Sequence, residues 1–265
     1  MTASQNRYSV LIETLFRSHY RSGIQEFYFE RDELSKIAEK LGIRLPKNLG
    51  DVIYSFRYRV PLPDGITQTA SPGLAWIIKG AGKSRYLFKQ ARLSRIEPDM
   101  AMLPIKIPNA TPEILLAHAF DDEQALLAKV RYNRLIDLFL GITAYSLQNH
   151  LRTTVEGVGQ IEIDELYVGV NRRGSQFIIP VQAKVGKDQH SVVQTDQDVL
   201  CCIERFPHLI CRPVSVHALG NDRIAMFELA LADDEIRVVD QRHYVLVAAP
   251  EISSEDLKRY NGCSD

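Results

Sequence analysis

Three polar residues in two neighbouring apolar segments are the first candidates for chemistry. Asp164 stands within the apolar run 160–168, and Gln182 and Lys184 stand two positions apart within the run 177–185. The first run alternates and is rich in β-branched residues, so it predicts a strand, and the second run is expected to be its partner strand. The segment 171–174 between them ends in glycine, which favours a hairpin turn.

The register of this hairpin decides where the polar side chains point. A three-residue loop over 172–174 would put its final glycine at the left-handed position that glycine fills at least cost. Asp164 would then lie opposite Gln182. Two residues further from the turn, Glu162 would face Lys184. Because residues two apart share a face of a sheet, we expect these four side chains to converge, whereas a two-residue loop would break the register.

An acid, an amide and a lysine among apolar neighbours form a costly arrangement unless something compensates them. A divalent cation would do so, since it offsets the burial of the carboxylate. The alternative interpretation is a solvent-exposed sheet face with a cross-strand ion pair. The pattern of residues leaves both interpretations open.

The flanking segments predict the elements that must hold these residues. In chain order they are a long helix from Glu123 to His150, strands over 153–155, 160–168 and 177–185, a helix over 194–206, a strand over 210–216 and a last strand region over 237–249. The order of the first six is αβββαβ, which predicts an α+β or α/β fold.

Asp164 stands eighteen positions before Gln182, which opens the motif Gln182-Ala183-Lys184. On adjacent strands of an αβββαβ core, this pattern resembles the PD-(D/E)XK nuclease superfamily, as found in type II restriction endonucleases, over residues 113–220. The resemblance implies that Asp164 binds Mg²⁺, for which Mn²⁺ can substitute, and that Lys184 orients or deprotonates the attacking water. Gln182 stands where Asp or Glu is usual, and its carbonyl oxygen would bind the metal without adding negative charge.

Further acidic residues are candidates for the same site. Glu162 is the nearest additional metal ligand by register, whereas Glu165 alternates to the other face and has a structural or supporting role. The family often adds a residue from the preceding helix. There, polar and small residues form one stripe at helical spacing: Asp137, Gly141, Ala144 and Gln148. Asp137 and Gln148 are therefore supporting candidates, with Arg134 or Arg152 as the partner of Asp137, against the alternative of a structural polar seam.

Residues 1–96 follow a different pattern. Helical spacing over 9–20, 32–41 and 47–59 precedes two short strands, 76–79 and 86–89, joined by a basic turn. Over residues 30–90 this order resembles a winged helix-turn-helix, in which the second helix of the motif enters the major groove. The resemblance implies DNA contacts from the third helix and the turn: Lys47, Asn48, Ser55, Arg57, Lys83 and Arg85. The alternative is a winged helix that contacts protein.

Charge divides the chain at the same place. Residues 1–96 hold 16 Lys and Arg against 8 Asp and Glu, whereas residues 97–265 hold 16 against 25. A basic module suits phosphate binding, because neutralised phosphates release counterions. Four prolines punctuate 97–112, which predicts an extended linker. We therefore expect a winged-helix domain over 1–96, a linker over 97–112 and a nuclease-like domain over 113–265.

The composition excludes several classes of protein. With 45% hydrophobic residues and a net charge of −1, the chain is not collagen-like, disordered or disulfide-stapled. No apolar run is long enough to span a membrane, and no secretory signal is evident. Four cysteines without a CxxC pair predict reduced thiols in the cytoplasm.

The sequence thus predicts a Mg²⁺-dependent, restriction-type DNA endonuclease. Cutting both strands of double-stranded DNA needs two such sites, which favours a homodimer. Two alternatives remain: a DNA-binding regulator whose nuclease-like domain is degenerate, and a structure-specific DNA repair nuclease.

Overall fold

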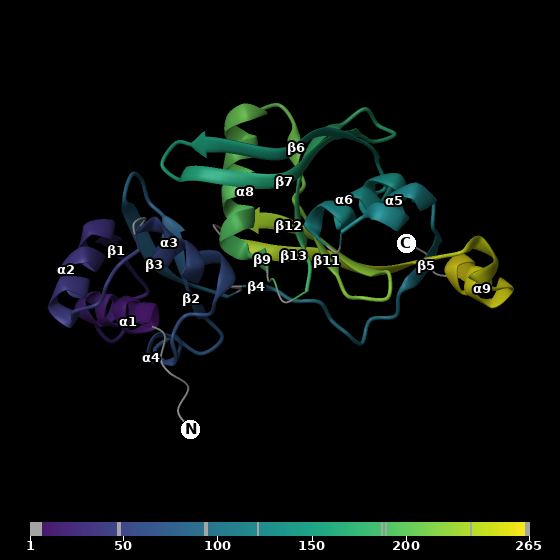
Figure 1. Ribbon diagram of the computed structural model, residues 1–265. Helices are drawn as coiled ribbons and strands as arrows, with labels where there is room; N and C mark the ends of the chain where they lie inside the picture. The colour runs from purple at the N-terminus through teal and green to yellow at the C-terminus, as the bar shows by residue number, and fades with distance from the viewer. Residues whose placement is uncertain are drawn as a thin grey trace, which may run out of the picture.

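A computed structural model describes residues 7–46, 49–92, 95–120, 122–186, 188, 190–233 and 235–262. The N-terminal part consists of α1 (Arg7–His19), β1 (Glu26–Glu30), α2 (Arg31–Leu41), α3 (Gly50–Tyr54), the π-helical turn η1 (Ser55–Arg59), α4 (Asp64–Thr67), β2 (Ala75–Gly80) and β3 (Arg85–Ala91). Its antiparallel sheet has the order β1-β3-β2. The predicted helices and the basic hairpin are present, and α3 with η1 stands at the place of the third helix (Figure 1).

An aromatic core holds the N-terminal part together. Phe16 of α1 packs edge-on against Trp76 and Phe88, with ring centroids 5.1 and 5.2 Å apart. Such pairs add to the gain from burying the rings. Helix α2 ends at Gly42, whose φ of +63° is the left-handed conformation that glycine adopts cheaply.

The C-terminal part contains one large sheet. Its elements are α5 (Glu113–His118), α6 (Glu123–Tyr132), α7 (Leu135–Leu140), β6 (Thr143–Val155), β7 (Gly159–Val170), β8 (Gln176–Lys184), α8 (Val192–Arg205), β10 (Ile210–Cys211), β11 (Val214–Ala218), β12 (Arg223–Ala232), β13 (Glu235–Val247), η2 (Ala249–Glu251) and α9 (Ser254–Gly262). The strand order is β5-β13-β12-β11-β8-β7-β6, and β5 is Ile105–Pro108.

The sheet is mixed and has helices on both faces. Strands β6, β7 and β8 are antiparallel neighbours, and β11 returns parallel to β8 after α8. On one face Cys201 and Cys202 of α8 pack against Ile178. On the other, Leu126 of α6 packs in a cluster with Ile179. Helix α8 also lies between the sheet and the N-terminal part (Figure 1).

The prediction of one long helix from Glu123 to His150 is wrong. Helix α6 ends at Tyr132, and α7 ends at Gly141, which has a φ of +63°. The chain then continues as the strand β6 from Thr143 to Val155, so the strand expected over 153–155 is only its last part. Pairing of β6 along β7 overrides the helical spacing of its apolar residues, because an edge strand with an exposed face does not need strict alternation.

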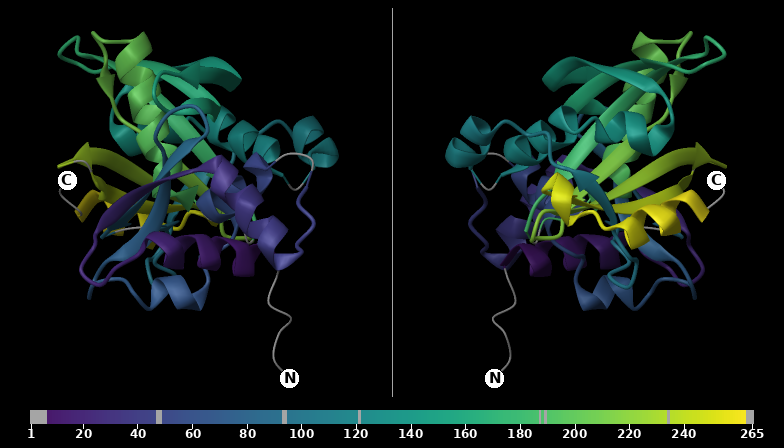
Figure 2. Two further views of the ribbon diagram at one scale, coloured as in Figure 1. Left: turned by 90° about the vertical axis from the view of Figure 1, so that its left-hand side faces the viewer. Right: turned by 90° about the vertical axis from the view of Figure 1, so that its right-hand side faces the viewer.

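Residues 97–112 are more than the connection that their prolines suggest. Ile105–Pro108 form β5, the edge strand that pairs in parallel with β13. Just before them, β4 (Arg95–Ile96) pairs with β9 (His190–Ser191). Beyond β11, the long hairpin of β12 and β13 widens the sheet, where the sequence predicted one last strand region. Figure 2 shows these C-terminal strands in yellow-green below α8.

The two parts are joined by both polar and apolar contacts. The Tyr58 hydroxyl donates to Gln197 Oε1 at 2.8 Å, and Lys79 Nζ lies 2.9 Å from Asp196. Gly80 at the end of β2 approaches the turn between β6 and β7 so closely that a Cβ there would lie 2.6 Å from the carbonyl oxygen of Val158. The N-terminal part is therefore fitted against the sheet and α8.

Two observations bear on the expectations from composition. No helix in the described ranges is long and apolar enough to cross a membrane. The three cysteines that the structure describes, Cys201, Cys202 and Cys211, are free thiols.

Candidate functional site

The hairpin of β7 and β8 has the predicted register. Val170 pairs with Gln176, and the pairing runs unbroken to Glu165 opposite Val181. The N–H of Asn171 donates to the carbonyl of Ser175 at 3.1 Å, which leaves 172–174 as a three-residue turn. Gly174 has a φ of +81° there, so the glycine stands where the turn requires it.

The register brings the four predicted side chains into one pocket of about 290 Å³. Asp164, Gln182, Lys184 and Glu162 all line it. The remaining walls come from the N-terminal part, from α6, β6 and α8, and from the segment after β8: Tyr54, Tyr58, Arg59, Glu123, Arg152, Asp188 and Gln194. Polar groups from both parts of the molecule therefore converge on the hairpin.

Asp164 and Lys184 form the buried centre of the pocket. Each is only 8% exposed, and Lys184 Nζ lies 4.0 Å from Asp164 Oδ2 and 3.4 Å from Glu123 Oε1. The N–H of Ala183 donates to Asp164 Oδ2 at 2.8 Å, which fixes that carboxylate. Burial raises the pKa of Asp164, and Lys184 and the Ala183 N–H act against this rise. Burial likewise raises the pKa of Glu123, again opposed by Lys184.

Gln182 is held by its amide nitrogen. Nε2 donates to the backbone oxygen of Glu162 at 2.9 Å and to Asp198 Oδ2 at 3.0 Å, which uses both of its protons. The amide oxygen faces Gln194, whose Nε2 lies 3.5 Å away. The orientation of Gln182 therefore leaves its oxygen on the side of the pocket.

Asp198 is a functional candidate that the sequence argument missed. It is 2% exposed on α8, and burial raises its pKa well above the usual value, with the Gln182 hydrogen bond acting against this rise. Its signal in the sequence is the polar pair Gln194 and Asp198, which are spaced i, i+4 and therefore share one face of the helix.

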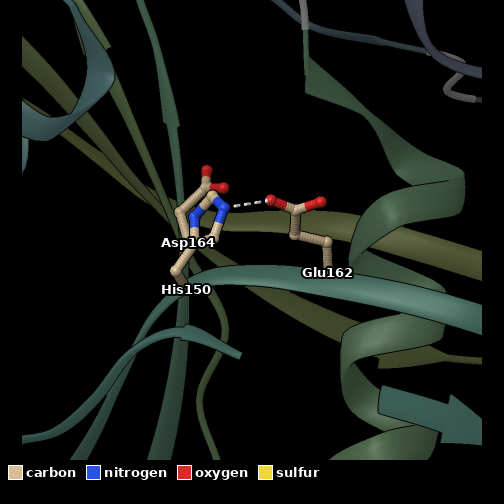
Figure 3. Close-up of side chains that lie close together, drawn as sticks. All are labelled: His150, Glu162 and Asp164. Carbon is tan, nitrogen blue, oxygen red and sulfur yellow. Dashed lines mark ion pairs between the residues drawn. The ribbon is translucent and has the colours of Figure 1, made fainter. Parts of the chain in front are cut away.

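His150 joins the two acids of β7. One ligand atom each from His150, Glu162 and Asp164 lies within 4.8 Å of the others (Figure 3). His150 Nε2 lies 2.9 Å from Glu162 Oε1, and Arg152 Nε lies 3.1 Å from Glu162 Oε2. An imidazole nitrogen and two carboxylates are ligands that divalent cations accept, so these residues fit a metal ion. Sequence spacing gave no hint of His150, which β6 carries to the side of Asp164.

The other acidic candidate on β7 lies away from the pocket. Glu165 is fully buried on the opposite face, where Arg131 Nη2 of α6 lies 2.8 Å from its Oε1 and the Ser146 hydroxyl donates to the same oxygen at 2.5 Å. Its role is to anchor α6 to the sheet.

The expected helical stripe does not exist. Asp137 lies on α7, pairs with Arg134 and accepts the N–H of Ala144 at 3.0 Å, so it joins the helix to β6. Gln148 lies on the exposed strand β6 and not on a helix. Neither residue lines the pocket around Asp164 and Lys184.

The predicted DNA contacts have different surroundings. Lys47 and Asn48 lie outside the described residues. On η1, Ser55 is half-buried, and Arg57 turns inward: its Nε donates to the carbonyl of Ile78 at 3.2 Å, and its guanidinium lies 4.8 Å from the centre of the Tyr58 ring. At the turn between β2 and β3, both Lys83 and Arg85 are exposed. The guanidinium of Arg85 lies 4.2 Å from the centre of the Tyr28 ring.

Comparison with protein-family models, with curated proteins and with solved structures finds no match for this chain.

Proposed function

We propose that the protein is a metal-dependent DNA endonuclease of restriction type that acts on double-stranded DNA as a homodimer. The observation that carries this proposal is the buried Lys184 held between Asp164 and Glu123, beside the possible ligands Glu162 and His150. A lysine among carboxylates beside a set of metal ligands suits hydrolysis of a phosphate ester, because negative charge builds on the phosphate during the reaction. The excess of basic residues in the N-terminal part supports binding of DNA phosphates.

The polar side chains around Lys184 have separate tasks in this proposal. Asp164 and Glu162 would supply carboxylate oxygens to a Mg²⁺ or Mn²⁺ ion, and Gln182 would supply its carbonyl oxygen. The imidazole of His150 would be a further ligand for Mn²⁺ rather than for Mg²⁺. When bound, that ion supplies Lewis acidity and lowers the pKa of water. Lys184 Nζ, kept in place by Glu123, donates to an oxygen of the scissile phosphate and stabilises its growing charge.

One observation favours the regulator instead. The two protons of the Gln182 amide are spent on Glu162 and Asp198, which is also how a purely structural glutamine behaves. A degenerate nuclease-like domain would keep this arrangement and cleave nothing. The experiment must therefore separate binding from cleavage.

The test compares three proteins on plasmid and mixed-sequence linear DNA with Mg²⁺ or Mn²⁺. We expect the unaltered protein to cleave and Lys184→Ala to lose about 100- to 1000-fold in rate. Lys129→Ala is the matched control, since Lys129 pairs with Asp222 on the surface away from the pocket. DNA binding without cleavage by any of the proteins, on every substrate, would support the regulator. Sequencing the cut ends separates a restriction-type enzyme from a repair nuclease that cuts at branched or damaged sites.

A further inference from the structure

A larger hollow lies between the two parts of the molecule. Its volume is about 570 Å³, and it shares several lining residues with the pocket around Lys184, so the two hollows are neighbours. The shared residues are Tyr54, Tyr58, Arg152, Glu162 and Gln194. We call this hollow the intermodule groove. The shared residues separate it from the candidate catalytic residues Asp164 and Lys184.

The charges along the groove suit a chain of phosphates. Arg31, Arg57 and Lys83 line it from the N-terminal part and Arg152 lines it from β6, and three acids, Asp51, Glu162 and Asp198, line it as well. The side chain of Lys83 is exposed at the turn between β2 and β3. Cations contributed by both walls of a cleft attract a nucleic-acid backbone and set its path.

Aromatic rings stand among these cations. Tyr54 is 46% exposed, and its ring lies 4.7 Å from that of Tyr58, between centroids. The guanidinium of Arg57 lies 4.8 Å from the centre of the Tyr58 ring, and Tyr86 also lines the groove. Aromatic faces interleaved with arginine are the surfaces on which unpaired bases stack.

The helix that would read a duplex is turned into this groove. In a winged helix, the segment of α3 and η1 would enter the major groove, which takes a whole helix. Here the hydroxyl of Tyr58 is bonded to Gln197, and Arg95 donates to the carbonyl of Tyr58 at 2.8 Å and of Val60 at 3.3 Å. These contacts hold one side of the segment against α8, which restricts how it could enter the major groove of a duplex. A single strand needs no such access.

We propose that the intermodule groove binds one unpaired DNA strand, with its bases stacked on Tyr54 and Tyr58 and its phosphates along the cations. That the strand then delivers its scissile phosphate to Asp164 and Lys184 rests on the proposed function. Within a double-stranded substrate, the site would then act where one strand is locally unpaired. The N-terminal part forms one wall of the catalytic cleft.

The test measures binding of the full chain by fluorescence anisotropy in EDTA, so that metal-dependent cleavage does not interfere. The probes are a labelled 20-nucleotide strand and a blunt duplex of the same sequence. We expect the strand to bind at least about tenfold more tightly. Tyr54→Ala should weaken strand binding by about five- to a hundredfold, which is the range measured for one stacked base.

The control is Tyr145→Ala, because Tyr145 is 60% exposed on β6 and does not line the groove. It should bind the strand as the unaltered protein does, and thermal unfolding should show both variants folded. Equal or tighter binding of the duplex, or strand binding that is unaffected by Tyr54→Ala, would overturn the proposal. If the strand binds as expected and nothing is cleaved, the groove assignment stands and the endonuclease fails. If duplex is cleaved without dependence on Tyr54, the endonuclease stands and the groove assignment fails.

Discussion

Two polar clusters lie side by side on neighbouring strands of the sheet. Gln182 and Lys184 of β8 are the register partners of Ser215 and His217 of β11. The first pair lines the pocket around Asp164. The second pair belongs to a buried chain of hydrogen bonds, and only the edge of His217 borders another hollow, which Lys184 also lines. In that chain His190 Nδ1 lies 2.6 Å from Ser215 Oγ, which lies 2.8 Å from His217 Nε2.

The two clusters offset the cost of burying polar side chains in different ways. The histidines are uncharged and satisfy one another, and Thr195 Oγ1 lies 3.1 Å from the remaining nitrogen of His190. Burial lowers the pKa of both histidines, to about 4 for His217, and the charge of Lys184 lowers it further. Asp164 and Lys184 instead lie 4.0 Å apart beside Glu123, in a pocket that also holds Gln182 and Glu162. A buried cluster of acidic and basic side chains that lines a pocket is thus a better candidate for function than one whose hydrogen bonds are made among its own neutral members.

The largest expected effect is on the rate of DNA cleavage, which should depend on the cluster of Asp164 and not on that of His217. Asp164→Asn removes the carboxylate beside Lys184, and we expect the rate of DNA cleavage to fall about 1000-fold. His217→Gln keeps a partner for Ser215 and should change the rate less than about threefold. Single-turnover cleavage under identical metal concentrations measures both. Equal losses in the two variants would show that the clusters act as one unit.

The next effect concerns stability in acid. Because the folded protein keeps His217 neutral down to a pKa of about 4, the unfolded chain binds a proton first, near its usual pKa. The contribution of His217 to stability is therefore present at neutral pH and is lost as the pH falls from about 6.5 towards 4. Between pH 7 and 4.5 we expect a loss of about 2 kcal/mol in the free energy of unfolding from this residue.

Urea unfolding of the unaltered protein and of His217→Gln at both pH values isolates the contribution of His217 to the free energy of unfolding. The difference between the two proteins should shrink in acid, because glutamine does not titrate. A difference that stays constant with pH would mean that His217 titrates alike in the folded and unfolded chain.

The smallest expected effect is a change in stability at Asp198, the buried acid that accepts a hydrogen bond from Gln182. Burial raises its pKa, so its contribution to stability is greatest at low pH and is lost as the pH rises through the raised value. Asp198→Asn keeps an acceptor for Gln182 and cannot ionise. We expect the variant to be more stable by about 1 kcal/mol at pH 8, with a smaller gain at pH 5. Thermal unfolding at both pH values measures this, and a variant that loses stability at pH 8 would show that the carboxylate is needed.

Local pattern was enough for the hairpin that carries Asp164, Gln182 and Lys184. Alternation predicted its strands, and Gly174 predicted its turn, because both depend on neighbours within a few residues. Local pattern failed at β6, where apolar residues at helical spacing occur in an edge strand. The spacing was compatible with a helix, and only the pairing with β7 selected the strand. For the same reason Gln148 lies on a strand and not on the expected helix, and the position of His150 beside Asp164 was not predicted.

The sequence by itself determined the strands of the hairpin, its register and the contrast between a basic first part and an acidic second part. Only the tertiary structure decided that Glu123 reaches Lys184, that Asp198 lies under Gln182 and that α3 faces the pocket. The physical reason is distance along the chain. A turn and an alternating strand are fixed by adjacent residues, whereas a helix and a strand far apart in sequence meet only when burial of both apolar faces brings them together.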